Sequence, residues 1–399
     1  MLKAEQMRTL PEYFNKISDP RRAAGRRHSL SNVLAIAAGA VLSGARGYKA
    51  IGQWAQDLSQ RARACFNCRY VNGHYEVPSR TVLRDVLMRV EPLQLDHALS
   101  AWNAQFAGDD QALAIDGKTL RNACDANGHR TQILGVVGHQ TGRCHTQQKV
   151  GTIAVGDGQK AKQTNEIGMA PTVLDHVEID GKTITADALL TQRQLADYLR
   201  ARGAHYVFTV KGNQKGLEKA IQEVFAQRGA PDYLEPPAVQ HGRFEQRAIW
   251  TSTALNDYLA KEKLFPGVGQ VFLIERERID KKTGQDRGKK EVVCGITSHQ
   301  PDTADAQALL AYNRGHWRIE NSCHWALDWN YDEDRCNIRS GHGPENMSAL
   351  RRLALGLIRA NSRDSIAATM QHLARLPHLV LDYLRLHGHS ASPPAAGQA

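Results

Sequence analysis

The chain has 399 residues, of which 42% are hydrophobic, so it can bury a sizeable core in two or three globular regions. Its formal net charge of +10 favours an acidic partner, and no apolar run reaches the length of a membrane span. Without an evident signal peptide, we expect a cytoplasmic protein that acts on a soluble polyanion and has no membrane partner.

Residues 1–108 are predicted to form a small helical domain. Ser31 is a candidate N-cap for a helix that ends near Gly44, and Pro78-Ser79 opens a second helix. A third helix is predicted from Leu93 to Trp102 by its apolar periodicity.

This domain carries much of the excess positive charge. Between Arg21 and Arg89 there are twelve Lys and Arg residues against three acids. One interpretation is a DNA-binding module that uses Arg80 and Arg84 of the helix beginning at Ser79. The alternative, an ordinary solvated basic face on a packing domain, is equally open.

Residues 109–211 have the texture of an α/β domain. Short apolar strands are predicted at residues 111–120, 131–140, 143–155, 182–187 and 205–211. Two helices are predicted between them, at residues 165–175 and 191–202. The first three strands resemble an antiparallel meander, and the later alternation predicts a mixed sheet. Two of these strands deliver an acid: Asp116 follows the apolar run Ala112 to Ile115, and Asp187 ends the run from Lys182.

The remainder divides into three predicted parts. Residues 212–302 read as a β-rich insertion, and residues 303–365 as helices that complete the core and carry Glu320. Residues 366–399 are predicted to hold a C-terminal helix and a disordered tail. Trp325, near Glu320, is expected to be a core aromatic.

Three carboxylates on separate elements could hold two divalent ions for phosphodiester chemistry, because Mg²⁺ prefers hard oxygen ligands. With 41 acids in the chain, a triple of acids alone is weak evidence. On its own segment Asp116 is at least as well explained as a strand-end acid that pairs with Lys118 or Arg121.

The context of these acids resembles the H-repeat-associated insertion-sequence transposases, a family of DDE transposases with a ribonuclease-H-like core. The matching stretches, in chain order, are Ile115 to Arg121, Thr164 to Ile167, Thr185 to Ala188 with Thr191-Gln192, Tyr206 to Gln214, His241 to Glu245, His316 to Asn321, His324 to Asp328, and Pro344 to Met347 with Leu350-Arg351-Arg352. Asp19-Pro20-Arg21 and Pro78-Ser79 also resemble the N-terminal associated domain of that family.

The resemblance implies a fold and a chemistry. The fold would be an α/β, ribonuclease-H-like mixed-sheet catalytic core with a β-rich insertion, preceded by a small helical domain. The catalytic and metal-binding triad would be Asp116, Asp187 and Glu320, with two Mg²⁺ (or Mn²⁺) ions per active site. The activity would be strand cleavage at the ends of an insertion sequence and strand transfer to target DNA.

The same resemblance implies double-stranded DNA as partner, both element ends and target, bound by a homodimer or a higher synaptic complex. The location would be the bacterial cytosol, in association with the nucleoid. Candidate DNA contacts, besides Arg80 and Arg84, are Lys118, Arg121, Lys211, Arg243, Arg314, His316 and Arg318. His316 stands where the wider superfamily commonly has an Arg, so which basic residue serves the phosphate is open.

Two alternatives to a transposase remain at this point. A nuclease without strand transfer would share the same core. A non-catalytic or domesticated DNA-binding protein derived from a transposase is a different class, and the presence of all three acids weighs against it.

Overall fold

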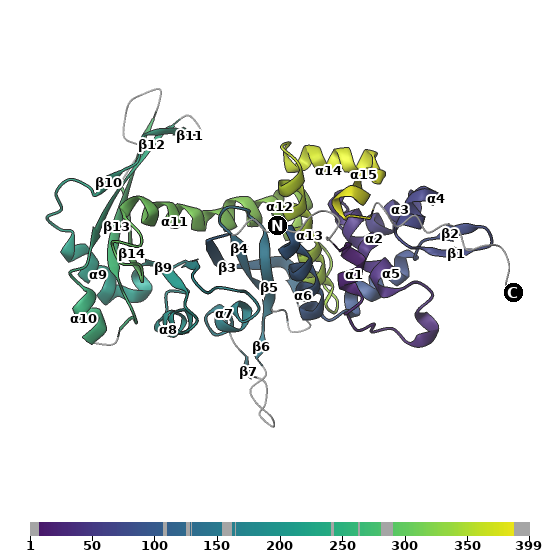
Figure 1. The fold of residues 1–399 in the computed structure, drawn as a ribbon, viewed down its shortest axis with the longest axis horizontal. Coiled ribbons are helices and arrows are strands. Elements are labelled where there is room, and N and C mark those ends of the chain that lie inside the picture. Colours follow the sequence, from purple (N-terminus) through teal and green to yellow (C-terminus); the bar gives the residue numbers. More distant parts are fainter. Residues whose placement is uncertain are drawn as a thin grey trace. The chain divides into compact units, whose positions relative to one another are not determined.

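The chain folds into two compact units in the computed structural model (Figure 1). The first unit comprises residues 1–109, 117–151 and 320–399, and the second comprises residues 110–116 and 152–319. The residues described are 8–106, 110–124, 128, 130–153, 162–163, 165–240, 243–261, 264–280 and 290–386. The predicted disordered tail therefore lies outside the described residues.

The first unit is mainly helical. Its α-helices are α1 (Leu10–Phe14), α2 (Leu30–Leu42), α3 (Tyr48–Gln56), α4 (Gln60–Cys65), α5 (Arg80–Arg89), α6 (Pro92–Asn103), α12 (Trp325–Tyr331), α13 (Gly343–Asn361), α14 (Ile366–Arg375) and α15 (Pro377–Tyr383). Short 3₁₀ turns are η2 (Ala23–Gly25), η3 (Ala104–Phe106) and η6 (Glu333–Arg335). Its strands are the hairpin β1 (Arg69–Val71) and β2 (His74–Glu76), the later part of β3 (Ala112–Cys124), β4 (Arg130–Gly138) and β5 (Cys144–Val150).

Helix α2 lies in the core of this unit. Of its residues, only Ser31 escapes burial, because small side chains let neighbouring elements approach closely. A Cβ added at Gly39 would lie 2.9 Å from the Trp54 ring, so glycine is required there. The predicted cap was wrong by two residues: Ser29 is the N-cap, and its hydroxyl accepts a hydrogen bond from the Asn32 amide at 3.2 Å.

Helix α13 packs against α2, α5 and α6. Asn346 is fully buried, and its side-chain amide donates to the carbonyls of Leu87 at 2.9 Å and Val90 at 2.8 Å. The end of α5 is thereby fixed to α13. Ser79 caps α5 and Pro92 begins α6, so the second and third predicted helices are confirmed.

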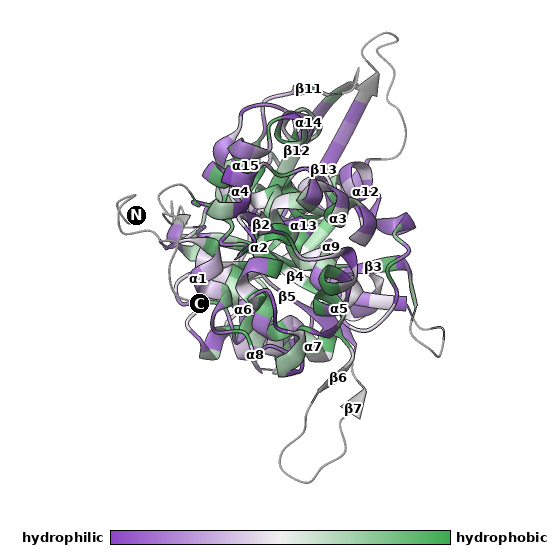
Figure 2. Ribbon diagram, turned by 90° about the vertical axis from the view of Figure 1, so that its right-hand side faces the viewer, coloured by the Kyte–Doolittle hydropathy of each residue, from purple (hydrophilic) through white to green (hydrophobic). Residues whose placement is uncertain are grey.

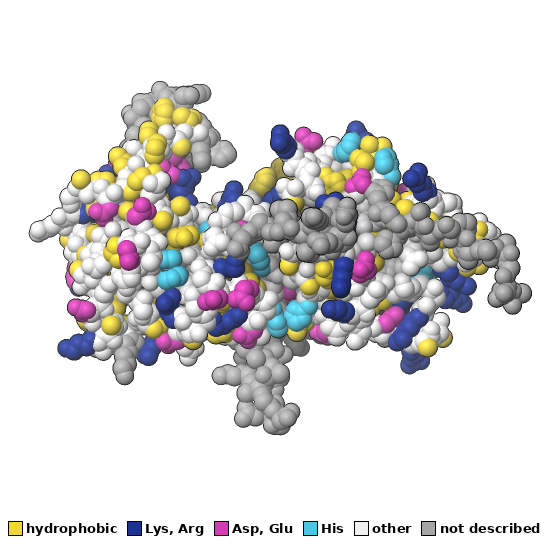
Figure 3. All heavy atoms as spheres, viewed as in Figure 1, with side chains coloured by type: hydrophobic (Ala, Val, Ile, Leu, Met, Phe, Trp, Pro, Cys, Tyr) yellow, Lys and Arg dark blue, Asp and Glu magenta, His cyan; other side chains and the backbone are white. Residues whose placement is uncertain are grey.

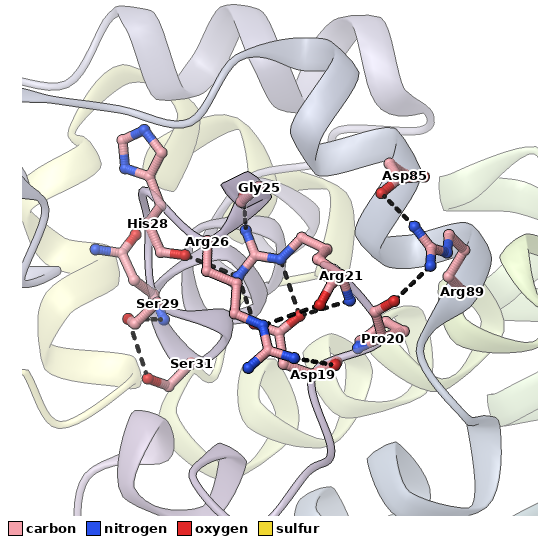
Figure 4. Close-up of polar contacts among 11 residues, drawn as sticks. Asp19, Pro20, Arg21, Gly25, Arg26, His28, Ser29, Ser31, Asp85 and Arg89 are labelled. Carbon is pink, nitrogen blue, oxygen red and sulfur yellow. Dashed lines mark hydrogen bonds and ion pairs between the residues drawn. The ribbon is translucent and has the colours of Figure 1, made fainter. Parts of the chain in front are cut away.

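The Asp19-Pro20-Arg21 stretch forms a structural brace (Figure 4). Arg21 donates to both carboxylate oxygens of Asp19, at 2.9 and 2.8 Å, and to the His28 carbonyl at 2.8 Å. Burial alone would raise the pKa of Asp19, but the hydrogen bonds and charge of Arg21 outweigh it and lower that pKa. Arg89 donates to the Pro20 carbonyl, which joins this loop to α5.

The second unit is built on a mixed sheet. Its strands are the first part of β3, β8 (Thr183–Ala186), β9 (His205–Val210), β10 (Tyr233–Leu234), β11 (Ala238–Gln240), β12 (Arg243–Ser252), β13 (Gln270–Asp280) and β14 (Glu291–Thr297), with a separate pair β6 (Thr152–Ile153) and β7 (Lys162–Gln163). β3, β8 and β9 are parallel, whereas β14, β13 and β12 continue from β9 in antiparallel pairs. The predicted mixed sheet is confirmed.

Helices cover this sheet. They are α7 (Glu166–Leu174), α8 (Arg193–Ala201), α9 (Lys215–Val224), α10 (Asn256–Lys261) and α11 (Ala306–Arg318), with the 3₁₀ turn η4 (Gly212–Gln214). Leu309 and Leu310 of α11 pack in one core cluster with Val207, Ile249 and Phe272 of three strands. In Figure 1, α11 lies on one side of the strands, and α7, α8 and α9 lie on the other.

The predicted insertion is β-rich but not separate from the core sheet. Its strand β14 pairs directly with β9, from Cys294 opposite Val210 to Thr297 opposite Val207.

β13 turns hydrophilic toward its end (Figure 2), where arginines and glutamates alternate. Exposed apolar side chains gather over the β10 to β12 edge (Figure 3). The division into five segments stays a prediction. None of the helices in the described ranges has the length and apolar character needed to cross a bilayer.

Candidate metal-binding carboxylate site

Asp116 and Asp187 lie beside each other on two neighbouring parallel strands. The prediction that Asp116 ends its strand was wrong, because β3 continues to Cys124, whereas Asp187 directly follows the end of β8. Ala114 pairs with Thr185, and Ile115 pairs with Ala186, so the next residue on each strand is an aspartate. Because side chains alternate along strands, the two carboxylates are expected on the same face of the sheet, at the point where β8 ends. Both are partly exposed, whereas the residues before them are buried. Two adjacent, partly exposed carboxylates beside buried strand residues are suited to bind a cation.

The Asp187 carboxylate is held by the turn that follows it. Its Oδ1 atom accepts a hydrogen bond from the Leu190 amide at 3.1 Å, which closes an Asx-type turn. Thr191 is fully buried, and its hydroxyl contacts the carbonyls of Asp187 at 2.9 Å and Thr209 at 2.7 Å. The turn that follows Asp187 therefore holds the Asp187 carboxylate in one position.

A second segment supports the same turn. Asn213 donates its side-chain amide to the Ala188 carbonyl, and Gln214 donates to the Thr191 carbonyl at 3.2 Å. Both donors belong to η4, directly after β9. Lys211-Gly212-Asn213-Gln214 thus acts on Asp187 through its loop, a role that the sequence alone did not indicate.

His316 of α11 lies against β8 rather than in solvent. It is buried, with Nδ1 at 3.2 Å from the Thr185 hydroxyl. Burial lowers the pKa of His316 to about 4, and the opposing charge of Asp187 does not reverse the shift. A neutral, buried imidazole is suited to positioning α11 on β8, so the predicted phosphate contact for His316 stays a prediction without support from its surroundings.

Glu166 is a further acid near Asp187. It lies in the first turn of α7, whose N-cap Asn165 accepts a hydrogen bond from the Gly168 amide at 3.1 Å. Burial, and then the negative charge of Asp187, raise the pKa of Glu166. Sequence reasoning quoted the Thr164 to Ile167 stretch but assigned Glu166 no role. The sequence feature that could have indicated Glu166 is its place in that matched stretch, as an acid at the start of a predicted helix.

Glu320 follows α11 in a π-helical segment, Ile319–His324. Such widened turns occur often at functional sites. Glu320 is exposed, whereas Ile319 beside it is fully buried. Glu320 belongs to the first unit and the aspartates belong to the second, so the predicted joining of all three carboxylates stays a prediction.

Three of the predicted DNA contacts have carboxylate partners. Lys118 is buried and lies 2.7 Å from an Asp328 oxygen, Arg121 lies 3.0 Å from Asp334, and Arg314 pairs with Glu235. These pairs leave less charge for a phosphate. Asp328 lies 210 residues after Lys118, and the alternative in which Asp116 pairs with Lys118 or Arg121 stays a prediction.

The remaining predicted contacts lie on the surface where described. Arg80, Arg84, Lys211 and Arg318 are exposed, and Arg243 is in β12 with its side chain outside the described part. Contact with DNA stays a prediction for each of them. The core assignment of Trp325 was wrong: its side chain is 57% exposed and stacks on Trp329, with ring centroids 5.6 Å apart.

Comparison with known proteins decides the family. A family model described as the transposase DDE domain matches residues 107–357, and a model for the region associated with that domain matches residues 11–103. The chain belongs to the DDE transposase family. The predicted resemblance and the α/β, ribonuclease-H-like fold class are thereby confirmed.

Several relatives of this DDE transposase family member cover most of its length. YbfL of Escherichia coli K12 is 27% identical over 88% of this chain and 91% of its own. YhhI of the same strain, named provisionally as an H repeat-associated transposase, is 26% identical over the same shares. An uncharacterized protein from the dhlA 3′ region of Xanthobacter autotrophicus is 31% identical over 73% of this chain and 94% of its own.

The family implies dependence on divalent metal ions. Asp116 and Asp187 fit that role by their chemistry, since both offer hard oxygen donors at one sheet edge. Within the described residues, the side chains do not form a ready cluster of three metal-ligating groups. The aspartate pair therefore offers two donor groups of a suitable kind, and metal binding by them stays a prediction.

Proposed function

We propose that this chain is an insertion-sequence transposase that cleaves DNA at the element ends and transfers the freed 3′ end to target DNA. The observation that carries the proposal is the register of β3 and β8, which makes Asp116 and Asp187 adjacent. The family match supports the reaction class, and the net charge of +10 supports a DNA substrate.

In this proposal Asp116 and Asp187 bind the metal ions, and Glu320 completes the ligand set. Two Mg²⁺ or Mn²⁺ ions, when bound, would supply activation of the attacking hydroxyl and stabilisation of the leaving oxygen. The chain itself holds the Asp187 carboxylate through the Leu190 amide and the Asp187 carbonyl through the Thr191 hydroxyl. Holding a ligand in one geometry before the reaction avoids reorganisation during it.

The test replaces one ligand without changing its shape. Asp116→Asn keeps the size of the side chain but removes the negative charge, so we expect cleavage to fall by at least about 10²-fold while DNA binding persists. The substrate is a supercoiled plasmid that carries the gene with its flanking DNA, incubated with Mg²⁺. Gel analysis measures nicked, cut and joined products.

Asp197→Asn is the matched control, because Asp197 is an exposed aspartate of α8 that pairs only with Arg193 in the described contacts. The control should cleave like the wild type. An active Asp116→Asn protein would exclude the metal role. Cleavage without joined products would identify a nuclease, and DNA binding without cleavage by the wild type would identify a non-catalytic descendant.

A further inference from the structure

A cavity of about 430 Å³ is lined wholly by residues of the first unit, and its lining includes none of the three carboxylates of the proposed triad. Its lining comes from the start of α3, from α5, and from the segment between α12 and α13. The lining residues share a cationic and aromatic character: Arg46, Tyr48, Arg84, Tyr331, Arg335 and Arg339. A volume of this size is in the range of small-ligand pockets and would admit one nucleotide unit.

The cavity has an excess of positive charge. Asp332 is the one carboxylate in its lining, and it is shared by Arg335 at 2.6 Å and Arg46 at 3.7 Å. In the described part of the chain, Arg84 and Arg339 have no carboxylate partner. Four guanidinium groups against one carboxylate leave a net charge of about +3 in the lining, which favours an anion.

Unsatisfied hydroxyl groups lie in the same wall. Tyr331 is fully buried, and its hydroxyl has no hydrogen-bond partner among the described residues. The buried hydroxyl of Tyr48 also lacks one there. Both hydroxyl oxygens are inaccessible to solvent, so they do not face the cavity, and its preference for an anion comes from the lining arginines.

The walls of the cavity are fixed by the protein itself. Arg351 of α13 is buried and donates to the Arg46 carbonyl at 3.0 Å on one side. On the other side it donates to Glu333 at 3.0 Å and to the Cys336 sulfur at 3.1 Å. Further along, the His342 amide donates to the Met88 carbonyl at 2.9 Å. The pocket is therefore preorganised, which reduces the cost of binding.

We infer that this cavity is a phosphate-binding subsite for DNA, which takes one backbone phosphodiester with its adjoining sugar and base. Arginine forks match the oxygens of a phosphate, and Tyr48 with Met88 offers an apolar surface to the nucleoside. The inference rests on the proposed function, since it assumes a DNA substrate. It also places Arg84, a predicted DNA contact, in the wall of a specific cavity.

The test neutralises the two arginines that lack carboxylate partners. An Arg84→Gln, Arg339→Gln double variant is compared with an Arg61→Gln, Arg375→Gln control, whose arginines are exposed in the same unit but outside the cavity. Fluorescence anisotropy with a 30-base-pair duplex measures affinity across a series of NaCl concentrations. Asp116 and Asp187 stay intact in both proteins.

For the cavity variant we expect a loss of affinity of roughly 10-fold to 100-fold, and a slope of log K against log salt that is shallower by about 2. The control should keep its slope. Equal loss in both variants, or no loss in the cavity variant, would overturn the inference. If the wild type still cleaves DNA in an Asp116-dependent way, that result leaves the proposed function standing.

The source of the phosphate is tested with dAMP. Calorimetric binding of dAMP at micromolar concentration to the wild type, lost in the cavity variant, would show a free-nucleotide site and overturn the DNA assignment. Binding of dAMP only at millimolar concentration or above supports a strand phosphate. A wild type that neither binds nor cleaves DNA would refute the proposed function and this inference together.

Discussion

The second unit contains two buried histidines that are neutral for the same physical reason. His299 accepts or donates a hydrogen bond at 2.9 Å with the Thr183 hydroxyl, and its ring stacks on His205 with centroids 4.0 Å apart. Burial, followed by the charges of His205 and Arg200, lowers the pKa of His299 to about 4. His316, whose ring contacts the Thr185 hydroxyl of the same strand, shows the same shift of its pKa.

Acid should therefore destabilise the protein through His299. An unfolded histidine has a pKa near 6.5, so between pH 6.5 and 4 the unfolded chain binds more protons than the folded chain, and stability falls as pH falls. From pH 7 to 5 we expect a loss of about 2 kcal/mol from this residue. Urea unfolding at both pH values measures it.

The comparison is between His299→Gln and His378→Gln, whose histidine is exposed in α15. The first variant should lose that part of the pH dependence, and the second should keep it. If the free energy of unfolding depends on pH identically in the wild type and in His299→Gln, the lowered pKa of His299 is contradicted.

The elements that meet at Asp187 give the stretch Lys211 to Gln214 a structural role, which is to hold the turn after Asp187. β8 ends at Ala186, α8 begins at Arg193, and the intervening turn is held by η4, which follows β9. Asn213 and Gln214 reach that turn through side-chain amides. Neither touches the carboxylate itself, so both are positioning residues.

Asn213→Ala should loosen the Asp187 turn without exposing core. We expect the rate of cleavage at saturating DNA to fall roughly 10-fold, because a ligand displaced by about 1 Å costs this much or more. The thermal midpoint should change little, since Asn213 is exposed. Raising Mn²⁺ concentration should restore part of the rate, which a purely structural defect would not show.

Gln227→Ala is the control for this change, because Gln227 is an exposed amide beyond α9. It should leave both rate and midpoint unaltered. A normal rate in Asn213→Ala, or a fall in its thermal midpoint that matches the fall in rate, would argue against positioning.

The helices and strands that were predicted correctly from the sequence are those with a local cap or a regular spacing of apolar residues. The helices at α5, α6, α7 and α13 and the strands β3, β8 and β9 followed from spacing and caps, as expected for strongly patterned segments. Helices α3, α4, α9 and α10 were missed. Three of them are shorter than ten residues, and α9 lies in the segment that was predicted to be β-rich. The pairing of Lys118 with Asp328 was also missed, because no local rule connects residues 210 positions apart.

The first unit is assembled from both ends of the chain. Buried aliphatic residues of α13 include Leu350, Leu353, Leu357 and Ile358, and this helix packs against α2, α5 and α6. Each such side chain contributes roughly 1.5–3 kcal/mol by burial. Four of them approach the whole stability of a typical domain, so α13 is part of the N-terminal core rather than an addition to it.

The predicted domain of residues 1–108 should therefore not fold alone. Without α13 its helices α2, α5 and α6 expose apolar surface, and Leu87 and Val90 lose the Asn346 amide. We expect a fragment of residues 1–108 to show poor chemical-shift dispersion and no cooperative thermal unfolding. A fusion of residues 1–108 to residues 320–386 through a flexible linker should recover both, because it restores α13. A well-dispersed spectrum and a sharp transition in the short fragment would instead establish residues 1–108 as an independent domain, and the interleaved packing would then be dispensable for its stability.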